Sequence, residues 1–260
     1  MSTLTPRRES LNDVSPFTVR LKFHGDLTFF LKSKAHVIER TLSEKTSVKD
    51  VIEAVGVPHT EIDLIVADGE PLDFSFQIEG AVDLDVYPFE QTPNAFPEKR
   101  LQARAIARFI ADGHLGKLVR DFRLLGFDVL YDCDAQDRQL IDQLKIDNGR
   151  ALLTRDRRLL MHSVVEHGYY LRSQDPLEQT IEVLLRFDLF RLIDPFTRCL
   201  RCNAGLEKAE KNSVIEKLEP LTKIYYEQFR RCTGCGQIYW AGSHFSKLQR
   251  RLEKIRECCS

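Results

Sequence analysis

The chain has 260 residues, of which 43% are hydrophobic and 30% are charged, which indicates a soluble globular protein of more than one domain. No apolar run reaches the roughly 18 residues of a membrane helix, so a membrane protein is excluded. The net charge of −1 is uneven, because residues 196–260 carry 13 Lys and Arg against 7 Asp and Glu. A polyanion is expected to bind there, with ordinary solvated charge as the alternative.

Residues 1–16 are polar and lack the apolar core of a secretion signal, so we expect a flexible N-terminus on a cytoplasmic protein. Residues 17–89 then follow the order strand, strand, helix, strand, strand. The stretch "FTVRLKF" alternates like a half-buried strand, and "SVKDVIEAVG" predicts a helix with Ser47 as its N-cap. The segment 90–103 carries two prolines and is interpreted as a linker.

The stretches "GVPHTEIDLIVADGEPLDFSFQI" and "DLDVYPF" resemble the ubiquitin-like, ThiS/MoaD-type module found in front of certain nucleases. This resemblance implies an α+β fold, the β-grasp. Sulfur carriers of that superfamily act through a free C-terminal Gly-Gly. Here the last strand ends in Tyr87, Pro88 and Phe89 and the chain continues, so we expect a docking or architectural module that binds a protein partner.

In residues 104–195, strands alternate with helices, which predicts an α/β domain with a parallel sheet. The predicted strands are "ARFIAD", "FDVLY", "RALLT" and "YYLR". The predicted helices are "GHLGKLVRDFRLLG", "DAQDRQLIDQLKIDNG", "RDRRLLMHSVVEHG" and "PLEQTIEVLLRFDLF". Residues that follow parallel strands collect at one edge of the sheet, where ligands of such folds bind.

Aspartates occupy this edge. Asp112 follows the first strand and Asp156 the third, so their side chains should converge. Asp134 and Asp137 lie at the start of the second helix. Asp134 is expected to cap this helix as an auxiliary acid, and Asp137 is expected to face the other acids. The alternative is that these two aspartates exchange roles. Clustered carboxylates favour Mg2+ or Mn2+, which would activate water for phosphodiester hydrolysis. The structural alternative is that an acid such as Asp156 only caps a helix.

Several cations flank these acids. Lys117, Arg155 and Arg158 are interpreted as contacts to RNA phosphates. Their neighbours, including Arg120 and Arg123, are interpreted as the solvated face of a helix.

Two C-x-x-C pairs in residues 196–246 are the strongest local signal, because four thiolates suit a tetrahedral Zn2+ ion. The ligands are Cys199, Cys202, Cys232 and Cys235. The long gap between the pairs predicts a zinc ribbon with an intervening arm, and a redox dithiol is the alternative. Trp240 is expected to pack on the metal core, or else to stack on an unpaired base. Residues 247–260 are interpreted as a basic tail.

The stretches "FIADGHLGKLVRDFRLLGFDVLY", "DAQDRQLIDQL", "GRALLTRDRRLL" and "YYLRSQDPLEQTIEVLLRFDL" resemble the Mut-seven C-terminal RNase family over roughly residues 105–245. The resemblance implies a PIN-like nuclease fold with metal-binding acids at Asp112, Asp137 and Asp156, and it extends through the ribbon. His114, where a larger apolar residue is typical, departs from the family pattern. We therefore predict a metal-dependent ribonuclease. A noncatalytic zinc-containing adaptor that binds RNA or the ribosome is the alternative.

Overall fold

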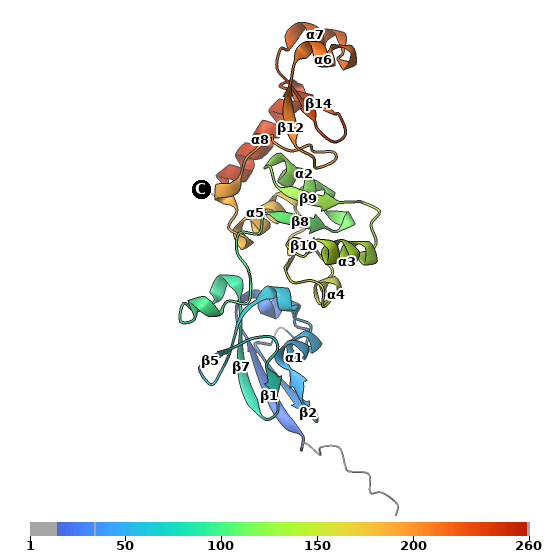
Figure 1. Cartoon of the computed structure of the whole chain (residues 1–260). Coiled ribbons are helices and arrows are strands. Elements are labelled where there is room, and N and C mark those ends of the chain that lie inside the picture. The colour runs from blue at the N-terminus through green and yellow to red at the C-terminus, as the bar shows by residue number, and fades with distance from the viewer. Residues whose placement is uncertain (1–14, 34, 259–260) are drawn as a thin grey trace, which may run out of the picture. The chain divides into compact units, whose positions relative to one another are not determined.

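The computed structural model describes residues 15–33 and 35–258, so the N-terminal segment expected to be flexible lies almost entirely outside the described residues. The chain divides into two compact units, residues 1–101 and 102–260 (Figure 1). Within the described ranges, no helix is both long enough and apolar enough to cross a membrane.

The first unit contains a five-stranded sheet in the order β2-β1-β7-β4-β5 and one α-helix. Strand β1 is parallel to β7 and antiparallel to β2, so the sheet is mixed. The bounds are β1 Phe17–Phe23, β2 Val37–Leu42, β3 Thr46–Ser47, α1 Val48–Ala54, β4 Ile62–Ala67, β5 Glu70–Leu72, β6 Gln77–Ile78 and β7 Val82–Pro88. This is the β-grasp arrangement expected from the sequence.

The sequence pattern explains this unit. Val19, Leu21 and Phe23 on β1 are at most 1% exposed, because alternate residues of a strand face the core. The Ser47 hydroxyl accepts a hydrogen bond from the Asp50 backbone N–H at 3.1 Å, which confirms the predicted N-cap of α1.

The second unit is built on a four-stranded sheet in the order β11-β10-β8-β9, in which all neighbouring strands are parallel. The chain passes outward from β8 to β9 and then returns to β10 on the other side of β8. Ligands of open α/β sheets bind at such a reversal, outside the carboxyl ends of the strands. The bounds are β8 Arg108–Ala111, α2 Gly116–Leu124, β9 Asp128–Tyr131, α3 Asp137–Ile146, β10 Ala151–Thr154, α4 Arg157–Leu160, β11 Gly168–Tyr170 and α5 Pro176–Arg186.

Helices cover both faces of this sheet. Phe109 of β8 belongs to a core cluster that includes residues of α2 and α5. Its neighbour Ile110 points to the other face, into a cluster with residues of α3 and α4. Successive side chains of β8 therefore point into the cores on opposite faces of the sheet, as in α/β domains whose sheet lies between two layers of helices.

One expected helix is much shorter than predicted. The stretch "RDRRLLMHSVVEHG" forms only the single turn α4, and the prediction of a full helix was wrong. The Val165 N–H bonds to the carbonyl of His162, and Val165 is buried beneath this turn. A longer helix would carry the chain away from β11, which starts at Gly168, only three residues after Val165.

The remaining residues form a three-stranded antiparallel sheet and a long C-terminal helix. The bounds are β12 Leu206–Ala209, α6 Lys211–Val214, α7 Pro220–Tyr225, β13 Phe229–Cys232, β14 Ile238–Trp240 and α8 Ser243–Glu257. The segment interpreted as a basic tail is thus largely helix α8. Its Leu252 and Ile255 are buried in the core cluster shared with α2 and α5, and each burial stabilises the domain by roughly 1.5–3 kcal/mol.

Candidate nuclease site and metal centre

The carboxyl edge of the parallel sheet brings acidic residues from three strands into line. Ala111 of β8 pairs with Tyr131 of β9 and with Leu153 of β10. Asp112 directly follows β8, and Asp132 directly follows β9. Two aspartates therefore lie on adjacent strands at the same height of the sheet.

Thr154 at the end of β10 connects two of the predicted acids. Its buried hydroxyl donates a hydrogen bond to the Asp112 carboxylate at 2.8 Å and accepts one from the Asp156 backbone N–H at 2.9 Å. One hydroxyl group thus contacts the side chain of Asp112 and the backbone of Asp156, and the predicted convergence of the two carboxylates stays a prediction.

Asp156 also caps helix α4. Its Oδ1 atom accepts the backbone N–H of Arg158 at 2.7 Å and that of Leu159 at 3.4 Å. The structural role considered from the sequence is therefore present. An exposed carboxylate that caps a helix through one oxygen still has a second oxygen available to other ligands.

The start of helix α3 differs from the prediction. Its N-cap is Gln136, which forms a reciprocal capping box with Gln139, so the assignment of Asp134 as the cap was wrong. A glutamine pair satisfies the first N–H groups of the helix in the way that a Ser and Glu pair usually does. Asp137 is the first residue of α3 and is exposed, and Asp134 is exposed in the preceding loop.

The three predicted metal-binding acids do not form a tight cluster. In the described part of the chain, ligand atoms within 4.8 Å of one another form two groups of three or more: the four cysteines, and Asp132 with Cys133 and Asp134. Asp132 is a candidate that the sequence analysis missed. The signal was available, because Asp132 directly follows the strand "FDVLY" just as Asp112 follows "ARFIA".

Glycines allow the loops after β8 and β9 to pack together. A Cβ atom on Gly113 would lie 2.7 Å from the backbone oxygen of Cys133. A Cβ atom on Gly116 would lie 2.7 Å from the hydroxyl oxygen of Tyr131, and that hydroxyl donates to the Gly113 carbonyl at 2.7 Å. Burial and nearby anions, including Asp112, raise the pKa of Tyr131. The loop that follows Asp112 is therefore fixed against the loop that begins at Asp132.

We expect Gly113→Ala to lower the stability of this domain by about 1–3 kcal/mol, because the new methyl group meets backbone atoms that cannot move away alone. Thermal unfolding followed by circular dichroism measures the effect. The matched control is Gly149→Ala, where the nearest atom to the new Cβ is 3.8 Å away and the expected change is within about 0.5 kcal/mol. Equal unfolding temperatures for the two variants would contradict the close packing of these loops.

The predicted RNA contacts Lys117, Arg155 and Arg158 are all exposed, and none forms an ion pair with an acid of the described residues. Lys117 lies in the first turn of α2, and the two arginines flank Asp156. Arg123, by contrast, is only 5% exposed and donates to the Val129 carbonyl at 2.9 Å. Its role is structural, and the prediction that Arg123 lies on the solvated face of the helix was wrong.

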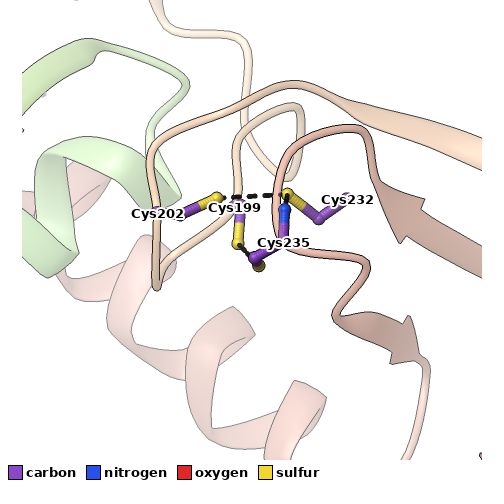
Figure 2. A group of neighbouring side chains, drawn as sticks. All are labelled: Cys199, Cys202, Cys232 and Cys235. Atoms are coloured by element: carbon purple, nitrogen blue, oxygen red, sulfur yellow. Dashed lines mark hydrogen bonds between the residues drawn. The ribbon is translucent and has the colours of Figure 1, made fainter.

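The four cysteines of the ribbon converge from two facing loops (Figure 2). The Sγ atoms of Cys199 and Cys235 are 3.7 Å apart, and those of Cys202 and Cys232 are 3.3 Å apart. Four sulfurs at about 2.3 Å from a central zinc ion form a tetrahedron with edges of about 3.8 Å. The donor set and its spacing therefore fit zinc. His244, exposed at the start of α8, does not belong to this group.

Hydrogen bonds and burial shift the pKa values of these thiols in opposite directions. The Ala204 backbone N–H lowers the pKa of Cys202 to about 6, whereas burial raises the pKa of Cys232 to about 12. The Tyr239 hydroxyl lies 3.1 Å from Cys199 Sγ, and burial raises the pKa of that tyrosine. Trp240 packs against the apolar core of the ribbon, in agreement with the packing role expected for it.

The first cysteine loop is attached to the parallel sheet. Arg123 of α2 donates to the carbonyls of Leu200 and Arg201 at 3.3 and 3.0 Å. Asn203, which follows Cys202, accepts the Val129 backbone N–H at 3.0 Å and donates to Asp128 at 2.7 Å. The metal loop and strand β9 are therefore joined by buried hydrogen bonds.

Asp128 is the centre of this attachment. Arg150, which is 6% exposed, donates to both of its carboxylate oxygens, at 2.9 and 3.1 Å. Burial opposes ionisation, but the hydrogen bonds from Arg150 and Asn203 lower the pKa of Asp128. This network lies at the edge opposite the acids, because Asp128 is the first residue of β9.

The second unit is an α/β domain on a parallel sheet that carries a four-cysteine ribbon, and it follows a unit with the β-grasp arrangement. Residues 107–252, more than half of the chain, match the family model of the Mut7-C RNAse domain, and the chain belongs to this family. Residues 17–94 match the model described as Mut7-C ubiquitin. Searches of the curated proteins and of the solved structures find no match. The family membership indicates a nuclease.

Proposed function

We propose that this protein is a divalent-metal-dependent ribonuclease that hydrolyses RNA phosphodiester bonds at the carboxyl edge of the parallel sheet. The contacts of the Thr154 hydroxyl with the Asp112 carboxylate and the Asp156 backbone N–H carry this proposal, because they bring the two residues to the reversal point of the sheet. Asp132 adds a third acid beside Asp112, and Asp137 is the remaining predicted ligand.

These acids suit Mg2+ or Mn2+ although they do not touch one another. Mg2+ keeps several waters and is commonly held by one or two carboxylates together with substrate phosphates. Bound there, the ion would supply activated water and stabilise the leaving oxygen. Asp112 and Asp156 would hold the ion, Asp137 and Asp132 would complete its surroundings, and Asp134 would be auxiliary. Lys117, Arg155 and Arg158 would position the phosphates of RNA.

The four cysteines would hold one structural Zn2+ ion, which fixes the ribbon against β9 through Asn203 and Arg123. The ubiquitin-like unit is proposed to dock a protein partner. A noncatalytic RNA-binding adaptor remains the second candidate, because Asp156 caps α4 and would be retained for that role alone.

The test is cleavage of labelled single-stranded and structured RNA in Mg2+ or Mn2+ by the wild type and by Asp156→Asn. Asparagine caps helices as well as aspartate does, so this variant removes the charge and keeps the fold. We expect cleavage that requires the added metal and falls at least about tenfold in the variant. The control is Asp142→Asn, a half-exposed acid on α3 paired with Lys145. RNA binding without cleavage in all three proteins would favour the adaptor.

A further inference from the structure

An interhelical ion pair and apolar contacts hold helix α8 against the nuclease domain. The Arg251 guanidinium donates to the carboxylate of Asp121 on α2, with Nε 3.0 Å from Oδ2. Asp121 is buried and also accepts the Thr180 hydroxyl of α5 at 3.3 Å. With Leu252 and Ile255 in the core, this pair fixes which faces of α2 and α8 meet.

Three lysines surround this ion pair. On an α-helix, residues three or four positions apart are neighbours on one face. Lys117 precedes Asp121 by four positions, Lys247 precedes Arg251 by four, and Lys254 follows it by three. All three lysines therefore lie beside the contact between α2 and α8, and all three are exposed.

These lysines differ from the paired cations of the same unit. Arg251 is neutralised by Asp121, Arg231 by Glu207, and Arg150 by Asp128. In the part of the chain that the structure describes, Lys117, Lys247 and Lys254 form no ion pair with an acid. Exposed Arg250 lies on the same side of α8 between the two lysines, and its Nε bonds only to the Ser246 carbonyl of its own helix, at 3.4 Å.

We propose that the exposed surface along the contact between α2 and α8 binds the backbone of single-stranded RNA. This surface is formed by Lys117 of α2 and by Lys247, Arg250 and Lys254 of α8. The surface leads to the acids, because Lys117 lies in the first turn of the helix that begins after Asp112. Unpaired cations on a rigid helix bind phosphates without reading sequence. The proposal rests on RNA being the substrate of the proposed nuclease and names where the strand lies outside the cleavage site.

The test measures binding, not cleavage. A labelled single-stranded RNA of about 16 nucleotides is titrated by fluorescence anisotropy at several salt concentrations, in an Asp112→Asn background without added Mg2+ or Mn2+. The variant is the triple change Lys247→Gln, Arg250→Gln and Lys254→Gln. The matched control, Lys32→Gln with Arg40→Gln and Lys99→Gln, removes two lysines and one arginine from exposed positions of the first unit.

The slope of log affinity against log salt changes by about 0.7 for each phosphate contact to a single strand. The α8 variant should therefore lose about 2 from this slope and bind at least about tenfold more weakly, whereas the control should bind like its parent. Lys117→Gln on α2, made separately, should reduce the slope by about 0.7. Melting curves establish that the variants remain folded.

Two results would overturn the proposal: affinity and slope that fall no more in the α8 variant than in the control, or a parent protein that binds no RNA. The latter would direct attention to an acidic protein as the partner of this surface. Failure of the nuclease proposal is distinct. A wild type that binds RNA through α8 but cuts none in any divalent metal would refute the nuclease function and support the surface.

Discussion

Asp112→Asn is expected to reduce RNA cleavage by at least about a hundredfold and to leave the fold intact. A divalent ion contributes several kcal/mol to the transition state, and each 1.36 kcal/mol corresponds to a factor of ten in rate. Loss of the carboxylate charge weakens the hold on that ion. The asparagine side-chain oxygen can still accept the Thr154 hydroxyl, which is now 2.8 Å from Asp112, so stability should change little.

Two companion variants sharpen this result. Asp132→Asn should also impair cleavage, because Asp132 follows Tyr131, the residue that pairs with Ala111 directly before Asp112. Asp134→Asn is the matched control two residues later, in an exposed loop, and should have a smaller effect. Rates are compared at saturating Mg2+ or Mn2+ and after equal melting temperatures are established. Equal cleavage by wild type and Asp112→Asn would refute the assignment of this edge as the active site.

Cys232→Ser is expected to abolish zinc binding and to unfold the ribbon. Structural zinc sites contribute about 10–16 kcal/mol of apparent binding free energy at neutral pH, which is available only to the folded ribbon. Zinc content by atomic absorption should fall from one ion per chain to none, and thermal unfolding should begin at a much lower temperature. Cys133→Ser is the control, because Cys133 is exposed and lies outside the four-cysteine group.

The damage should extend into the nuclease sheet at one particular amide. The Val129 N–H is bonded to Asn203 beside the metal loop, so its hydrogen exchange should accelerate in Cys232→Ser. The amide of Leu152 on β10, bonded to the His167 carbonyl away from the ribbon, serves as an internal reference. Retained zinc in the variant would exclude the four-thiolate site. Unchanged exchange at Val129 would show that the ribbon and sheet are not coupled.

Local patterns predicted most of this fold. Alternation identified β1, apolar spacing identified α2, α3 and α5 of the parallel-sheet domain, and the position after a strand predicted that Asp112 lies at the edge of the sheet. The spacing of the two cysteine pairs predicted that the four thiols converge, since thiols at that spacing suit one ion. Each of these signals lies within a short stretch of sequence, where periodicity and turn chemistry are informative.

The failures came from interactions that a short stretch does not reveal. Helix α8 was taken for a tail because its many charges obscure Leu252 and Ile255, whose partners lie on α2 and α5. Arg251 of α8 pairs with Asp121 of α2, which lies 130 positions earlier in the chain. The cap of α3 was wrongly predicted because aspartate is a preferred N-cap and Asp134 lies at the start of the expected helix, whereas the N-cap is Gln136. Asp132 was overlooked although it occupies the same position after its strand as Asp112.

The return of α8 to the nuclease core has a consequence for biosynthesis. The ribbon lies between α5 and α8 in the chain, yet α8 supplies Leu252 and Ile255 to the core that α5 also lines. A ribosome therefore releases both cysteine pairs before the last helix that this core requires. Shortening the chain after α5 would leave an exposed apolar surface in place of an independent nuclease.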